Sequence, residues 1–100
     1  MKRKLFFKTT EELNRLNLIL IDKTERALKD IKFNYKNVYS AYQVGFVGNN
    51  AYEYFKVYIN EKASDRQFFF TVDMDAIEQW GFYRKLKRSL KLLTKGIDLR

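Results

Sequence analysis

Hydrophobic residues recur with two different spacings along this chain, and the change between them limits the folds open to it. From Glu11 to Ile31 they share one arc of a helical wheel, which predicts an amphipathic helix over 11–31. The members of this arc are Leu13, Leu16, Leu20, Thr24, Ala27, Leu28 and Ile31. Between residues 37 and 72 the spacing falls to two, which is the period of a β-strand. A chain of 100 residues is the length of one domain, so we expect a single domain over 1–100.

Turn sequences divide the β-rich part into three runs, at 37–48, 51–62 and 67–72. Gly48-Asn49-Asn50 lies between the first two and is typical of a hairpin. Residues 63–66 supply the second turn, so we expect a three-stranded antiparallel meander over 37–72. Residues 1–9 alternate loosely and predict a short basic strand or arm.

Two capping signals mark the expected starts of the helices. Thr9 with Glu12, and Asp75 with Glu78, both have the spacing of a capping box. The second pair predicts a basic amphipathic helix over 75–95. Gly81 lies inside that range and costs about 1 kcal/mol relative to alanine, so a break near it is the alternative. The expected order is β-α-β-β-β-α, an α+β fold with helices packed on a mainly antiparallel sheet.

Missing residue types exclude several kinds of chemistry. The chain has no His and no Cys, which removes the usual zinc sites, thiolate nucleophiles and imidazole catalysis. Asp73 and Asp75 are too few for a Mg²⁺ site. We therefore expect no catalytic residues, no metal and no cofactor.

No run approaches the length of a membrane span, and Leu5-Phe6-Phe7 is too short for a signal peptide, so we expect a cytoplasmic protein. Residues with AT-rich codons are frequent, which suggests a low-GC genome, either that of a bacterium or that of one of its mobile genetic elements.

Positive charge is concentrated at the two ends of the chain, whose net charge is +8. In the predicted last helix, cations share one face without an acidic residue, opposite Phe82, Leu86, Leu90 and Leu93. A row of one sign suits phosphates, whereas the attraction of cations to a helix C-terminus explains only its last members. The row consists of Arg84, Lys87, Arg88, Lys91 and Lys95, with Trp80 on the same face and with Lys2, Arg3 and Lys4 as further candidates.

A ladder of tyrosines follows the second β-rich run. Phe55, Val57 and Ile59 alternate toward one face of this run, which leaves the other face to a second set of side chains. Aromatic rings between cations can stack on unpaired bases. The alternative is that the tyrosines pair across strands and stabilise the sheet. The second set is Tyr52, Tyr54, Lys56 and Tyr58.

These patterns predict a small, basic, non-enzymatic accessory protein that binds nucleic acid, with single-stranded DNA or RNA favoured and weak sequence specificity. Leu18 and Ile19 lie off the main helical arc, and the alternative is a protein-interaction subunit or inhibitor of a larger replication or defence enzyme that is contacted through them. A second alternative is a ribonuclease toxin that uses Lys, Arg and Tyr in place of His.

Three partial resemblances accompany this prediction. The order α-β-β-β-α from residue 11 onward resembles the double-stranded-RNA-binding domain, although Asp75-Ala76-Ile77-Glu78 stands where that family has a basic motif. The stretch from Lys4 to Leu13 resembles the strand-into-helix start of ribbon–helix–helix repressors. The whole order is similar to that of small basic mRNA-cleaving toxins, in which a helical hairpin follows the first strand.

Overall fold

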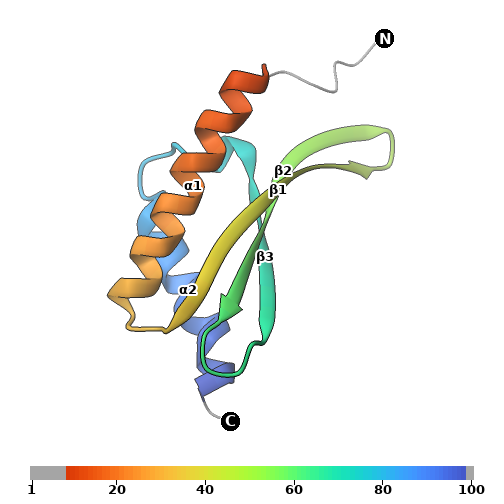
Figure 1. Ribbon diagram of the computed structural model, residues 1–100. Helices are drawn as coiled ribbons and strands as arrows, with labels where there is room; N and C mark the ends of the chain where they lie inside the picture. Colours follow the sequence, from red (N-terminus) through yellow and green to blue (C-terminus); the bar gives the residue numbers. More distant parts are fainter. Residues whose placement is uncertain (1–8, 99–100) are drawn as a thin grey trace.

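The computed structural model describes residues 9–98, with only the backbone for residues 96–98. Two helices pack on one face of a three-stranded antiparallel sheet in the order α-β-β-β-α, which confirms the predicted α+β class (Figure 1). The strand or arm predicted over residues 1–9 lies almost wholly outside the described residues. The elements are α1 (Thr10–Asp30), β1 (Tyr35–Val47), β2 (Asn50–Glu61), β3 (Gln67–Asp73), a short 3-10 turn η1 (Met74–Ala76) and α2 (Phe82–Asp98).

Helix α1 matches its prediction to within one residue at each end. The Thr9 side chain accepts a hydrogen bond from the Glu12 backbone N–H at 3.1 Å, which satisfies one of the free donors of the first turn. In a complete capping box the Glu12 carboxylate would accept a hydrogen bond from the Thr9 backbone N–H. Here that carboxylate pairs instead with Arg15 at 2.6 Å. The helix ends where Lys32 takes a positive φ of 61° and the Phe33 N–H donates to the Leu28 carbonyl at 2.9 Å.

The sheet has the order β1-β2-β3, with antiparallel pairing throughout. Gly48, with φ of 60°, provides the left-handed residue of the β1–β2 turn. Strand β3 pairs with β2 only from Tyr54 to Asn60. Residues 44–53 therefore continue past β3 as a two-stranded extension, the hairpin arm (Figure 1). Phe46 and Val47 are exposed at its end.

Both helices cover the same face of the sheet, which encloses a single core. The inner face supplies Phe55, Val57 and Ile59 of β2, as their alternation predicted. From the helices come Leu16, Leu20, Ala27 and Leu28 of α1 and Phe82, Leu86 and Leu90 of α2. The outer face of the sheet has no helix against it.

The predicted last helix differs from the observed one at both ends. It was expected over 75–95, but α2 begins at Phe82 and continues through Gly96 to Asp98. Asp75 lies inside η1 and does not cap a helix. Gly81 has φ of +85°, which an α-helix cannot include, so the chain breaks there. The break lets Met74 and Ile77 enter the core before the helix starts.

Candidate functional site

Helix α2 presents a line of cations to solvent along its outer side. Arg84, Arg88, Lys91 and Lys95, here called the α2 row, are all exposed. They recur every three or four residues and so share one face of the helix, over a length of about 17 Å. The opposite face holds the buried Phe82, Leu86, Leu90 and Thr94. Because every member of the row follows Gly81, the break does not scatter it.

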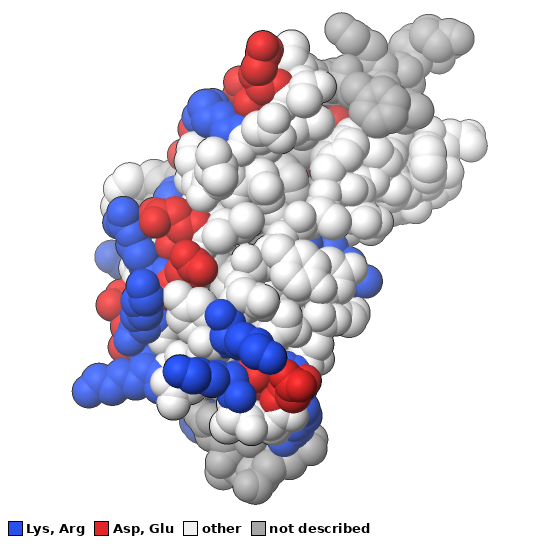
Figure 2. Space-filling view, in the orientation of Figure 1, with Lys and Arg blue, Asp and Glu red and all other residues white. Residues whose placement is uncertain are grey.

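No ion pair within the described part of the chain involves a member of the α2 row. Helix α1 differs, because its exposed Arg15 pairs with Glu12 at 2.6 Å and Arg26 pairs with Asp22 at 3.1 Å. Figure 2 shows positive and negative side chains mixed over the side of the molecule that bears α1, and hardly any on the hairpin arm. The row thus consists of positive charges that no described acidic side chain neutralises.

Lys87, the fifth predicted cation, has a different environment. Its Nζ lies 3.7 Å from Asp30 Oδ2 at the end of α1 and 5.5 Å from the centre of the Tyr83 ring. The Tyr83 hydroxyl donates to the same carboxylate. This hydrogen bond, together with Lys87, lowers the pKa of Asp30, while burial and Asp30 raise the pKa of Tyr83 to about 12. Lys87 therefore helps to join the two helices.

The tyrosine ladder lies on the outer face of the sheet, as predicted. Tyr52 is exposed, and Tyr54, Lys56 and Tyr58 are half-buried. The antiparallel register adds Tyr39 and Phe69, which flank Tyr58 on the neighbouring strands. Sequence reasoning missed these two residues, because their membership depends on the pairing of distant strands.

The rings of this outer face cover one another. Tyr39 and Tyr58 have centroids 4.9 Å apart and planes 13° apart, so they lie face to face. Lys56 Nζ lies 4.1 Å from the centre of the Phe69 ring. Tyr52 stacks on Tyr54 at 5.4 Å. The ring faces on which a nucleic-acid base could stack are thus already in contact with other side chains of the sheet.

The remaining predicted residues are separated from this face. The α2 row lies on the helix side of the molecule and the tyrosines on the opposite side, so the structure does not bring them together. Lys2, Arg3 and Lys4 lie outside the described residues. Leu18 is 68% exposed, whereas Ile19 is half-buried and packs against the core. Trp80 is 92% exposed.

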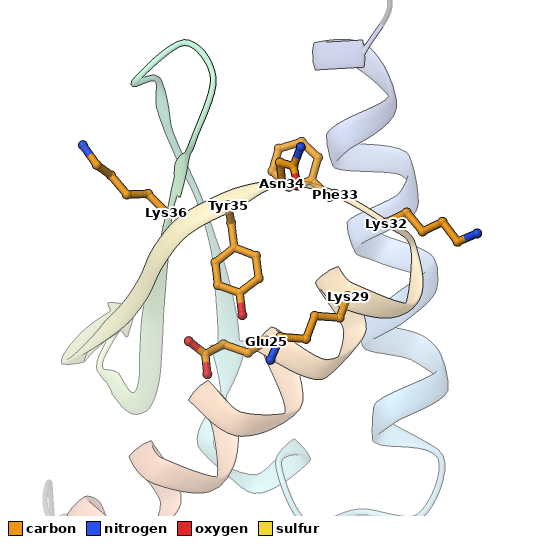
Figure 3. A pocket seen from close by; sticks show the side chains of 7 residues that line it. All are labelled: Glu25, Lys29, Lys32, Phe33, Asn34, Tyr35 and Lys36. Atoms are coloured by element: carbon orange, nitrogen blue, oxygen red, sulfur yellow. The ribbon is translucent and has the colours of Figure 1, made fainter.

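A shallow hollow of about 600 Å³ lies between the end of α1 and the start of β1. Figure 3 shows Tyr35 pointing toward Glu25 and Lys29, while Lys32 and Lys36 point away from each other. Lys36 also pairs with Asp65 at 3.0 Å. Since its cations do not converge, the hollow does not form an anion site.

The chain matches no protein-family model, no curated protein and no solved structure. Among the side chains that the structure describes, residues 9–95, there is no group of three or more acidic side chains placed to hold a metal ion. Neither helix in this part of the chain is long and apolar enough to cross a membrane.

Proposed function

We propose that this protein binds nucleic acid through the α2 row and acts as an accessory protein without catalytic activity of its own. The observation that carries the proposal is a line of exposed cations of one sign on α2 that form no ion pair with any side chain the structure describes. Cations on a protein surface usually alternate with acids, as they do on α1. A repeating polyanion is the ligand that such a row fits best.

The length of the row sets the size of the contact. About 17 Å of helix equals the axial rise of roughly five nucleotides in B-form DNA, at about 3.4 Å per nucleotide measured along the duplex axis. Phosphate contacts fix position and supply affinity but carry no base sequence. We therefore expect weak sequence specificity and strong dependence on salt.

The test is the slope of affinity against salt concentration. If all four cations of the row contact phosphates, the logarithm of the binding constant should fall with a slope of about −3.6 for duplex DNA and about −2.8 for a single strand. Replacing the four by glutamine should remove most of this slope. Fluorescence anisotropy of labelled oligonucleotides measures it directly.

A matched control separates the row from overall charge. Arg26, Lys29, Lys62 and Arg66 are also two arginines and two lysines, all exposed and outside α2. Replacing these four by glutamine lowers the net charge equally and should leave the slope nearly unchanged. Equal losses in the two variants, or no binding by the native protein at low salt, would contradict the proposal.

A second candidate function is a protein-interaction subunit. Leu18 of α1 and Phe46 and Val47 of the hairpin arm are large apolar side chains that the described structure leaves exposed. A partner held through them should stay bound after nuclease treatment and be lost when Phe46 and Val47 are both replaced by serine. Retention of the partner by the Arg84→Gln/Arg88→Gln variant would separate this function from phosphate binding.

A further inference from the structure

Trp80 is the most exposed large hydrophobic residue described in this protein, at 92%. It lies in the turn between η1 and α2. Tryptophan offers a large apolar surface and is highly buried on average, so such exposure is unusual. No ring contact or hydrogen bond within the described residues involves its side chain. Both faces of the indole are therefore open, in contrast to the stacked rings of the sheet.

The turn that carries Trp80 is held firmly by the rest of the domain. Ile77 is completely buried, and Lys23 Nζ donates to its carbonyl oxygen at 3.0 Å. Arg15 of α1 makes two hydrogen bonds to the Glu78 carboxylate, at 2.7 and 3.1 Å. The Gln79 N–H donates to the Ala76 carbonyl at 3.1 Å. The exposure of Trp80 thus belongs to an ordered turn.

The position of this turn relates Trp80 to the α2 row. The Phe82 N–H donates to the Gln79 carbonyl, so the turn runs directly into the first turn of α2. Arg84 follows Trp80 by only four positions, which limits their Cα atoms to a distance of about 14 Å even in extended chain. A strand whose phosphate contacts Arg84 can therefore place a neighbouring base on the indole.

Charges around the turn favour a path of that strand along α2. The preceding segment, residues 73–80, contains no cation of its own, with Asp75 exposed and Glu78 paired to Arg15 of α1. The following segment holds the cations of the row. Phosphates are therefore attracted along α2 and away from η1, which leaves the base nearest Arg84 beside Trp80.

We infer that Trp80 stacks on an unpaired base, so that the preferred ligand of the α2 row is a single strand. The inference rests on the proposed function. Bases inside a duplex are already stacked on both faces and cannot reach a side chain without being extruded. Stacking of one base on an aromatic side chain should increase the affinity for a single strand by about 5- to 150-fold.

The chain offers a specific probe, because Trp80 is its only tryptophan. Titration with oligothymidine at low salt should quench the indole fluorescence and shift it to the blue. A long blunt-ended DNA duplex, which contains no unpaired base, should bind through the row with little change in emission. Trp80→Ala should lose about 5- to 150-fold in affinity for oligothymidine, and Trp80→Phe should recover most of it. Leu18→Ala is the control, because it removes another exposed apolar side chain, which lies on α1 and not in this turn.

The outcomes separate the two proposals. Salt-dependent binding of oligothymidine with unchanged indole emission and unchanged affinity of Trp80→Ala would overturn the stacking and leave phosphate binding intact. Failure of both DNA ligands to bind at low salt would refute the proposed function and the inference together. A blue shift caused by vesicles of phosphatidylserine, or by a co-purifying protein, but not by oligothymidine would assign Trp80 to that partner instead.

Discussion

Replacing Ile77 by alanine tests the break between η1 and α2. In a continuous helix from Asp75 to Lys95, Ile77 would lie on the side opposite Leu86 and Leu90, among the cations. In the structure it is 0% exposed and part of the same core as those leucines. The two arrangements therefore give opposite expectations for one substitution.

The magnitude follows from burial. Truncation of a fully buried isoleucine to alanine costs about 2–5 kcal/mol, through lost transfer free energy and the cavity left behind. Truncation of an exposed side chain usually changes stability by less than about 0.5 kcal/mol. A domain of this kind has a free energy of unfolding of about 5–15 kcal/mol, so the effect of Ile77→Ala should be large.

Urea denaturation followed by far-ultraviolet circular dichroism is the appropriate assay. Trp80 is exposed in the native state, so its emission is a poor probe of unfolding. Ile77→Val should cost about 0.5–1.5 kcal/mol, and Leu18→Ala should cost little. Suppose that Ile77→Ala lowers the free energy of unfolding by less than about 0.5 kcal/mol and leaves its slope against urea concentration unchanged. This result would refute the buried position of Ile77 and favour the continuous helix.

Two further predictions follow from backbone conformation and from titration. Gly81→Ala should lower the free energy of unfolding by about 1–2 kcal/mol in the same assay, because φ of +85° is unfavourable for residues with a side chain. The cost comes from the backbone alone, since a Cβ at this position meets no atom within 4 Å. An unchanged urea midpoint would contradict this prediction. Burial and Asp30 raise the pKa of Tyr83 to about 12, so the folded state keeps a proton that the unfolded state loses above pH about 10. Stability should therefore decline from pH about 10 to about 12, and less so in Tyr83→Phe, as measured by denaturation at fixed pH; an equal decline in both proteins would show that Tyr83 does not contribute.

Local patterns account for the elements that sequence reasoning predicted. Helix α1 follows from its apolar arc and from Thr9, whose cap needs only residues three positions apart. The burial of Phe55, Val57 and Ile59 follows from alternation within one strand. Each of these signals is complete within a short segment, so no knowledge of the tertiary structure is needed to read it.

Other features depend on contacts between distant segments. The capping-box spacing at Asp75 indicated a helix that starts there. Burial of Met74 and Ile77 instead requires the chain to turn at Gly81, so that the helix begins only at Phe82. Gly81 was the one local sign of this break. The contact of Lys87 with Asp30 depends on how α1 and α2 lie against each other. Pairing between strands likewise decides which aromatic rings of the outer face cover one another.

The hairpin arm divides β2 into two parts that differ in their neighbours. From Tyr54 to Asn60 the strand is hydrogen-bonded on both edges, by β1 and β3, and it contributes to the core. From Asn50 to Glu53 the described strand that pairs with it is β1. Backbone amides open locally with a free energy that depends on such surroundings. Hydrogen exchange within β2 should therefore be slow from Tyr54 to Asn60, because opening of these amides requires two neighbouring strands to separate and the core of the domain to unfold.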